Sequence, residues 1–426
     1  MSFVHDRLAL LLTSLLVASC GKELNPAYCA AHPDDVDCAR DGGGDGPTDC
    51  TSDDGCAAPT SICDLPAGVC VQCTPDRAEE CTGTTPVCAD DRTCRGCTAH
   101  AECASSACQP DGACAPDTDV AYVDAAGSDT PLCTLAMPCT SVADALATRR
   151  PFIKLTGTVD EGATIRVDDQ DVTFLASPGA KLTRDSTGVI LEIRGTSHVS
   201  LVDLEISGAL GASQGLGISI PPGANVDLAL LRARILNNQG GGISASGGSL
   251  SISQSTLSGN QGGGISAMNS VTSITNSFIH HNGNTVTASF GGMALRPVGA
   301  STIELNTIVD NQANLGAASA GGVFCDVAGQ ALARNLIFRN TGGATGTTQV
   351  FGNCTYGDSF VAAGASATDN SPGFVSPNVA PFDYHLTASS PTTVRDAAGA
   401  CAGIDFDGDT RPAGAACDLG ADEVVP

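Results

Sequence analysis

Three side chains that could act together in acid–base chemistry recur at a fixed interval in the C-terminal half of the chain. His281, Asp310 and Arg339 lie 29 residues apart, and each stands directly before an Asn. If the chain completes one coil per interval, the three side chains lie next to one another on successive coils. A carboxylate between an imidazole and a guanidinium suits an acid–base pair beside an anion-binding group. The same charges also suit a solvated, charge-compensated edge, and the sequence favours that interpretation.

A repeat of five Asn residues predicts the elements that would position these side chains. Consecutive Asn residues of the repeat are 22, 22, 29 and 29 residues apart. The Asn residues are Asn238, Asn260, Asn282, Asn311 and Asn340. The residue eight positions earlier is always aliphatic: Leu230, Ile252, Ile274, Ile303 or Leu332. The residue three positions earlier is also aliphatic: Ile235, Leu257, Ile279, Ile308 or Ile337. Fixed offsets with variable intervals predict stacked coils whose connecting segments differ in length.

Two aliphatic residues five positions apart cannot share one face of a flat strand, whose period is two, so the chain must bend between them. The residue at the bend is small or polar in every repeat: Ala233, Ser255, Ser277, Asn306 or Asn335. Leu201 and Ile206 have the same spacing, with Ala209 at the Asn position, and predict a sixth, degenerate coil. Because coils stack at about 4.8 Å, the five Asn side chains should form an internal amide ladder without catalytic chemistry.

Two further outward columns border the predicted stripe. His280 and Phe338 stand two positions before their Asn residues, and Phe278 stands four positions before Asn282. Aromatic rings beside polar groups are what a sugar-stacking surface would show, although a covering loop would also explain them. His280, Phe278 and Phe338 are therefore candidate ligand-binding residues.

Twelve Cys between residues 50 and 114 form a second repeat of three four-Cys units. Units of 23 to 24 residues cannot bury a core, so two disulfides per unit should hold each together. Four Cys allow three pairings, and the sequence does not choose among them. The spacing of Cys70, Cys73, Cys94 and Cys97 also fits a zinc ribbon, but that would leave eight further Cys unexplained. Outside these units, Cys29 with Cys38, Cys133 with Cys139, Cys325 with Cys354, and Cys401 with Cys417 are expected to pair.

The N-terminal residues predict export. Residues 1–19 combine Arg7 with a short apolar run and precede Cys20, and residues 20–49 form an acidic, Gly-rich tether. The 426-residue chain has a formal net charge of −26 and only three Lys. So acidic a surface repels nucleic-acid phosphates, and nucleic acid is excluded as a partner. The absence of Trp alongside 50 Gly favours an all-β solenoid over a compact aromatic core.

Several segments resemble known families. Val17-Ala18-Ser19-Cys20 resembles the lipobox of bacterial lipoproteins, which implies lipidation of Cys20, an outer-membrane or cell-surface location, and membrane contact through the lipid alone. Assigning Cys20 to the lipid leaves 20 of the 21 Cys for pairing.

The repeat, with residues 121–129 and 138–146 before it, resembles right-handed parallel β-helix proteins of the pectate-lyase-like superfamily. The resemblance implies a β-helix over 120–395 and a C-terminal cap over 396–426, the latter from the segments 405–412 and 418–423. Asp405, Asp407 and Asp409 look like the start of a calcium loop, although no Glu completes the EF-hand spacing.

The motifs of polygalacturonases and pectate lyases are absent: Arg296-Pro297, for example, lacks the second Arg of the lyase segment. The sequence therefore predicts a surface lipoprotein whose β-helix binds a polysaccharide or a cell-surface partner, or is structural. The alternative is a polysaccharide lyase or glycoside hydrolase that uses His281, Asp310 and Arg339 in an outward groove. The sequence determines neither the ligand nor the oligomeric state.

Overall fold

The computed structural model describes residues 50–425, except 129, 300 and 363–368. The predicted signal peptide, the tether, Cys20, Cys29 and Cys38 lie outside the described residues. Contacts divide the described chain into two units: residues 50–78 with 90–93, and residues 79–89 with 94–425. The third Cys unit therefore belongs to the same unit as the solenoid.

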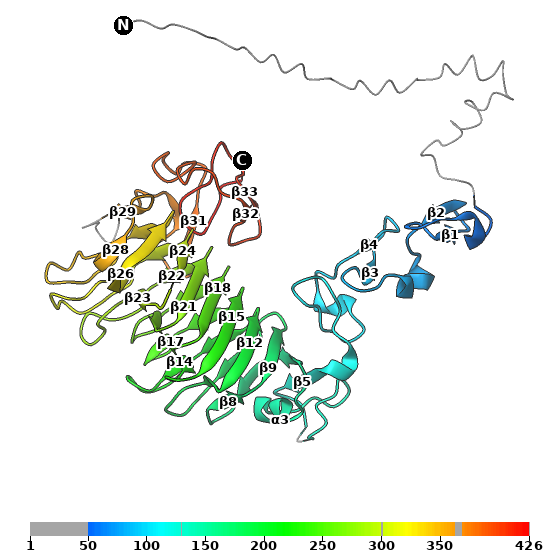
Figure 1. Cartoon of the computed structure of the whole chain (residues 1–426), viewed down its shortest axis with the longest axis horizontal. Coiled ribbons are helices and arrows are strands. Elements are labelled where there is room, and N and C mark those ends of the chain that lie inside the picture. The colour runs from blue at the N-terminus through cyan, green and yellow to red at the C-terminus, as the bar shows by residue number, and fades with distance from the viewer. Residues whose placement is uncertain (1–49, 129, 300, 363–368, 426) are drawn as a thin grey trace, which may run out of the picture. The chain divides into compact units, whose positions relative to one another are not determined.

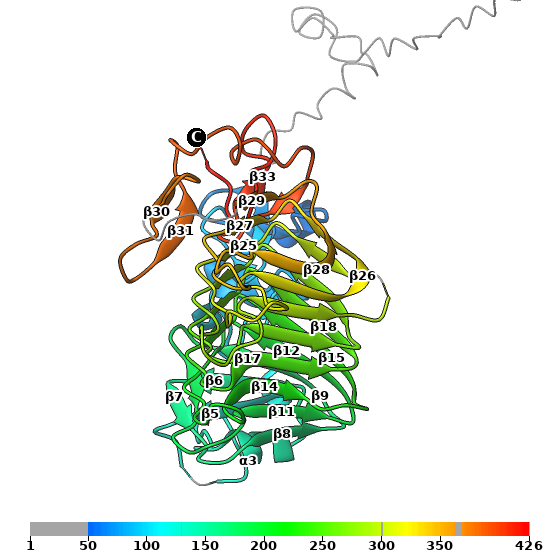
Figure 2. The same cartoon turned by 90° about the vertical axis from the view of Figure 1, so that its left-hand side faces the viewer.

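The solenoid is a stack of parallel strands in three walls, as predicted (Figures 1 and 2). Sheet 1 contains β5 (Val120–Asp124), β6 (Phe152–Thr156), β9 (Asp171–Ala176), β12 (Thr196–Val202), β15 (Asn225–Leu231), β18 (Ser249–Ser253), β21 (Val271–Thr275), β24 (Thr302–Glu304) and β26 (Val323–Ala333). Sheet 2 contains β8 (Ile165–Asp168), β11 (Leu191–Arg194), β14 (Leu216–Ile220), β17 (Gly241–Ser246), β20 (Ile265–Met268), β23 (Met293–Arg296), β28 (Val350–Thr355) and again β26, which joins the two sheets. Sheet 3 contains β7 (Thr158–Asp160), β10 (Lys181–Thr183), β13 (Glu205–Ser207), β16 (Arg234–Leu236), β19 (Thr256–Ser258), β22 (Phe278–His280), β25 (Thr307–Val309), β27 (Leu336–Phe338) and β29 (Phe360–Ala362). The helix α3 (Val142–Ala147) precedes the coils, with Ser141 as its N-cap.

The two aliphatic columns of the repeat line the interior, which confirms the prediction. The earlier column lies in sheet 1, where Leu230, Ile252, Ile274, Ile303 and Leu332 are in register. The later column lies in sheet 3, where Ile206 of the degenerate coil is in register with Ile235, Leu257, Ile279, Ile308 and Ile337. Each of these side chains is at most 2% exposed, so hydrophobic burial holds every coil onto its neighbours.

The Asn side chains form the predicted ladder. The Nδ2 of each Asn donates to the Oδ1 of the next at 2.8–2.9 Å, from Asn238 through Asn340. Each Nδ2 also donates to a strand carbonyl of the preceding coil, as Asn282 does to Leu257 O. A second ladder runs at the preceding corner, where Ser255, Ser277, Asn306 and Asn335 accept from the backbone N of the coil before. The small or polar residues at the bend are therefore a second buried column of hydrogen bonds.

A C-terminal cap folds over one end of sheet 3. It contains the hairpin of β30 (Phe374–Ser376) with β31 (Asp383–Leu386) and the short pair of β32 (Gly403–Ile404) with β33 (Thr410–Arg411). The capping region begins before residue 396, because the β30–β31 hairpin belongs to it. Gly420 N bonds to Arg334 O, Ala421 N to Thr307 Oγ1, and Gln254 Nε2 to Asp405 O, so three coils anchor the cap.

The Cys-rich units are held by disulfides, as predicted. Their short elements are β1 (Ile62–Asp64), β2 (Val69–Val71), β3 (Val87–Cys88) and β4 (Cys94–Arg95), with 3-10 turns at Asp53–Gly55, Pro75–Glu80, His100–Glu102 and Asp117–Asp119. The first and third units share one connectivity, Cys50–Cys63 with Cys56–Cys70 and Cys97–Cys108 with Cys103–Cys114. Cys81 pairs with Cys94, and Cys73 and Cys88 are also in disulfides, which excludes the zinc ribbon.

The pairs Cys133–Cys139, Cys325–Cys354 and Cys401–Cys417 are formed as predicted. A search of the described residues for a helix long and apolar enough to cross a membrane finds none.

Candidate functional site

The outward side chains of sheet 3 are partly exposed on some coils and buried on others, and this difference in exposure decides where a ligand could bind. On β16 and β19 the outward residues are Arg234, Leu236, Thr256 and Ser258, which keep part of their surface exposed. On β25 and β27 the outward Val309, Leu336 and Phe338 are fully buried. They pack with Phe374, Tyr384 and other apolar residues of the cap. The cap therefore seals the later coils and leaves β16 and β19 open.

The predicted stripe lies beneath this cap. His281, Asp310 and Arg339 occupy successive corners, each in the left-handed backbone region with φ between 52° and 55°. Arg339 Nε donates to Asp310 Oδ1 at 2.9 Å, and its Nη2 donates to Asp310 Oδ2. The Arg339 side chain is only 2% exposed. The structure thus brings the carboxylate and guanidinium together, but encloses them.

The cap supplies the remaining partners of this ion pair. Arg339 Nη1 donates to Asp369 O at 2.9 Å and to Asn378 Oδ1 at 2.6 Å, and Nη2 donates to Pro377 O at 3.0 Å. The Tyr384 hydroxyl donates to Asp310 Oδ2. With its guanidinium bonded on all sides, Arg339 is engaged in holding the cap on the coils rather than facing a substrate.

The two adjacent histidines are held neutral. His280 Nδ1 lies 3.0 Å from His281 Nδ1 and 3.2 Å from Ser258 Oγ. Burial, with a smaller contribution from His281, lowers the pKa of His280 to about 3. Burial also lowers the pKa of His281, although the Asp310 carboxylate opposes the shift. Neutral imidazoles this close can share one hydrogen-bond proton, and Phe382 stacks on His281 with ring centroids 3.9 Å apart.

An open groove lies beside the sealed stripe, where the cap edge faces β16, β19 and β22. The groove encloses about 920 Å³. Its solenoid wall is lined by Arg232, Ala233, Arg234, Leu236, Asn237, Gln254, Thr256, Ser258, Phe278 and His280, and its cap wall by Ser376, Pro381, Phe382, Asp383, Tyr384, His385, Phe406 and Asp407. The ring of Phe382 remains 38% exposed. The groove thus combines an accessible aromatic ring with hydroxyl, amide, guanidinium and carboxylate groups.

The three predicted ligand-binding residues differ in their exposure to the groove. His280 lines the groove and is partly exposed. Phe278 also borders it but is only 5% exposed, because Phe406 and His385 pack on its ring with centroids 4.6 and 4.9 Å away. Phe338 is completely buried against Phe360 and Phe374. The expectation of exposed rings at Phe278 and Phe338 therefore does not hold, since the cap covers both.

The acidic loop proposed for calcium is organised by its first carboxylate. Asp405 is fully buried; its Oδ1 accepts from the backbone N of Asp407, Gly408 and Asp409, and its Oδ2 accepts from Glu423 N. Both oxygens are therefore used to hold the turn. Asp407 instead approaches His385, with Oδ2 3.2 Å from Nε2.

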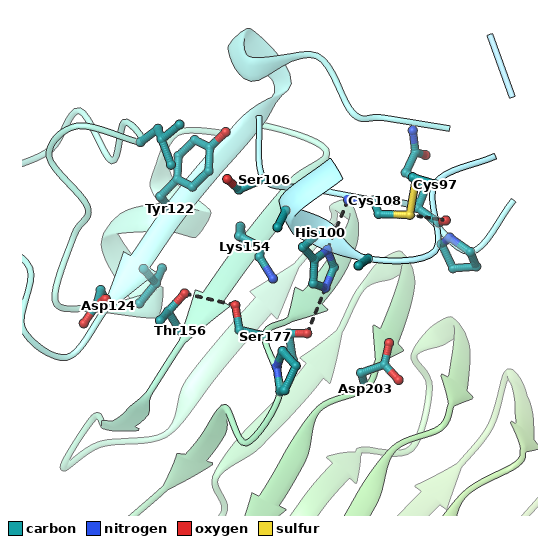
Figure 3. A pocket seen from close by; sticks show the side chains of 18 of the residues that line it. Cys97, His100, Ser106, Cys108, Tyr122, Asp124, Lys154, Thr156, Ser177 and Asp203 are labelled. Carbon is teal, nitrogen blue, oxygen red and sulfur yellow. Dashed lines mark hydrogen bonds between the residues drawn. A yellow bond between two sulfur atoms is a disulfide. The ribbon is translucent and has the colours of Figure 1, made fainter. Parts of the chain in front are cut away.

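A second cavity lies at the N-terminal end of the solenoid, where the third Cys unit packs on the first coils (Figure 3). It encloses about 1020 Å³, and Lys154 of β6 reaches toward His100 at its side. His100 Nε2 bonds to Ala176 O at 3.0 Å, and its Nδ1 accepts from Cys108 N. The Lys154 amine is buried and has no hydrogen-bond partner within the described residues. Burial lowers its pKa to about 7, although Asp203 opposes the shift.

Replacing Lys154 with Met is expected to stabilise the protein by about 1–3 kcal/mol at pH 7, since it removes an unpaired buried polar group at nearly equal volume. Because the Lys154 pKa falls from 10.5 to about 7 on folding, the unfolded chain binds more protons between those values. The stability of the native chain should therefore rise with pH across this window, and that of the Met variant should rise less. Denaturant unfolding from pH 7 to pH 10 measures both effects.

Lys181→Met is the matched control, because Lys181 is partly exposed on β10. This control should leave both the stability and its pH slope close to those of the native chain. Equal slopes for the native chain and the Lys154 variant would contradict the lowered pKa of the buried amine.

Two further features of the structure have recognisable signals in the sequence. Lys154 is a single cation between the buried Ile153 and Leu155 in an apolar strand, and such a position implies that another element covers the outer face of that strand. Asp383, His385, Asp407 and Asp422 meet in the cap from separate segments, and only Asp383 and His385 lie close together in the sequence.

Residues 188–371 match the family model of the right-handed β-helix region. No curated protein matches the chain. Among solved structures, pectate lyase Pel9A is similar with 16% sequence identity and a TM-score of 0.35, covering 71% of this chain and 96% of that chain. With the parallel register of its three walls, the family match establishes a right-handed parallel β-helix as the fold of this chain.

Proposed function

We propose that this protein is a cell-surface lipoprotein whose β-helix binds carbohydrate in the groove between β16, β19, β22 and the cap. The observation that carries the proposal is Phe382, which is 38% exposed and lines the groove together with Thr256, Ser258 and His280. Aromatic rings pack against the apolar faces of sugars, and neighbouring hydroxyl and amide groups satisfy sugar hydroxyls. The groove volume of about 920 Å³ suits a short oligosaccharide.

A binding role is favoured over catalysis because the catalytic candidates are engaged elsewhere. Asp310 is held by Arg339 and Tyr384, and Arg339 is held by three groups of the cap. A general acid or base must come within hydrogen-bonding reach of its substrate. Neither Asp310 nor Arg339 lines the groove, whereas Tyr384 of the cap, which bonds to Asp310, does.

The test is binding of the full chain to an array of neutral and acidic glycans. Phe382→Ala should weaken the binding of any retained glycan about tenfold or more, since one aromatic ring at the centre of an interface commonly contributes this much. Tyr356→Ala is the matched control, because Tyr356 is 43% exposed and does not line the groove.

Loss of binding in both variants, or in neither, would refute the groove as the binding site. Incubation of the retained glycans with the protein, followed by assays for new reducing ends and unsaturated products, tests the lyase or hydrolase alternative.

The lipid anchor forms the second part of the proposal and is supported by Val17-Ala18-Ser19-Cys20. Cys20→Ser should release the exported protein from the membrane fraction of expressing cells. Retention of this variant in that fraction would contradict anchoring through Cys20.

A further inference from the structure

Three potential ligand atoms converge in the cap from segments far apart in the chain. His385 lies on β31, Asp407 in the loop between β32 and β33, and Asp422 near the C-terminus. One nitrogen or oxygen atom of each lies within 4.8 Å of the other two. This spacing suits one ion, because ligands 2.0–2.2 Å from a metal lie a few ångströms from one another.

The histidine is oriented as a metal ligand would be. Its Nδ1 lies 2.6 Å from Asp383 Oδ1, which fixes the ring and places the Nδ1 proton on that bond. The other nitrogen, Nε2, is buried and makes no hydrogen bond to any described residue. It faces Asp407 Oδ2 at 3.2 Å. A carboxylate on one imidazole nitrogen, with the lone pair of the other directed at further oxygens, is the arrangement that supports a bound metal.

The charge of this cluster also calls for a cation. Asp422 is 6% exposed, and its Oδ2 accepts from Leu386 N. Asp383 and Asp407 place further carboxylate oxygens at His385, 2.6 Å from Nδ1 and 3.2 Å from Nε2. Buried carboxylates are costly unless a positive charge offsets them.

A second histidine in this chain shows what an ordinary ion-paired ring looks like. His198 has Asp171 2.6 Å from Nδ1 and Asp227 3.1 Å from Nε2, on opposite sides of the ring. One carboxylate per nitrogen leaves no shared point for an ion, and the ring is 58% exposed. At His385 a third carboxylate joins, because one ligand atom each of His385, Asp407 and Asp422 lies within 4.8 Å of the other two.

We propose that His385, Asp407 and Asp422 bind a divalent transition-metal ion of the Zn²⁺ class, with Asp383 as the positioning residue. One imidazole with two carboxylates suits Zn²⁺ better than Ca²⁺, which prefers all-oxygen sites. Asp383, His385 and Asp407 also line the groove, so the ion lies at its edge and joins the three segments of the cap. The proposal does not depend on carbohydrate binding.

Calorimetric titration of the full chain with Zn²⁺ tests the site. The expected result is one equivalent bound, with Ca²⁺ at the same concentration failing to compete. His385→Gln and Asp407→Asn should each remove this binding. Asp383→Asn should weaken it about 10- to 100-fold, as expected for a group that orients a ligand. Binding of Co²⁺, followed by its visible absorption spectrum, gives an independent readout of a nitrogen–oxygen ligand set.

His198→Gln is the matched control and should leave Zn²⁺ binding unchanged. Absence of binding by the native chain, or binding that survives His385→Gln, would overturn the proposal. Far-ultraviolet circular dichroism establishes that each variant remains folded, and Asp407→Asn is the safest of these variants because the Asp407 side chain is 51% exposed.

Discussion

Asp310→Ala is expected to destabilise the protein by about 3–5 kcal/mol, because it leaves the buried Arg339 guanidinium without its counter-charge. The Arg339 side chain is 2% exposed, and its other partners among the described residues include carbonyl and amide oxygens of the cap, which carry no charge. The cap should loosen first, since Tyr384 also loses the acceptor of its hydroxyl. Thermal unfolding and limited proteolysis between residues 369 and 384 measure these two effects.

Asp203→Ala provides a matched control for that result. Asp203 accepts two hydrogen bonds from Arg232 in the same fork geometry, at 2.7 and 2.9 Å, but the two side chains are 36% and 43% exposed. Its loss should therefore cost less than about 1 kcal/mol. If Asp310→Ala kept native stability while abolishing a measured turnover, Asp310 would be catalytic and the structural interpretation would be wrong.

The stacking of Asp310 on Arg339 and the cap that covers them differ in how far the sequence predicts them. The neighbourhood of Asp310 and Arg339 was predictable, because residues at one offset of a repeat stack in register. The cover over them was not predictable, because residues 369–425 carry no period and dock through contacts such as Gln254 with Asp405 that are about 150 residues apart. The sequence therefore predicted the columns of the solenoid but not which of them reach solvent.

The Asn ladder was recognisable for a related reason. A buried amide has donors and an acceptor to satisfy, and an identical amide one coil away satisfies them at each level, which is why the same residue recurs. The second ladder could not be recognised in the same way. Ser and Asn can both accept from the backbone N of the coil before, so this column varies in residue type, and its members were predicted only to be corner residues.

The disulfide pairing within each Cys-rich unit could not be predicted either. Four Cys in 21 residues, as in Cys50 to Cys70, are all close enough to pair in any of three ways. The observed first-to-third and second-to-fourth pairing depends on the hairpin of β1 and β2, which brings Cys63 and Cys70 to opposite strands.

The cap contains a second buried ion pair whose loss should have a still wider effect. Arg411 and Glu423 are bonded at 2.9 Å with side-chain exposures of 0% and 1%. Arg411 also donates to Asp418 O and Gly420 O, and Glu423 accepts from the backbone N of Ala413 and Asp418. Arg411→Met leaves Glu423 buried without its cation and should cost about 3–5 kcal/mol, most of it in the cap.

The consequence for function follows from what the cap covers. If the Arg411→Met cap opens, the outer faces of β22, β25 and β27 expose Phe278, Val309 and Phe338, so the variant should bind a hydrophobic dye that the native chain does not. Glycan and Zn²⁺ binding should fall together, because the groove takes one wall from the cap and the proposed metal ligands come from three of its segments. Arg395→Met is the control: its ion pair with Asp396 is long, at 4.0 Å, and its side chain is 35% exposed, so all three measurements should stay native. A stable Arg411→Met chain with normal dye exclusion would show that the disulfide Cys401–Cys417 and the backbone contacts to Arg334 and Thr307 hold the cap without this ion pair.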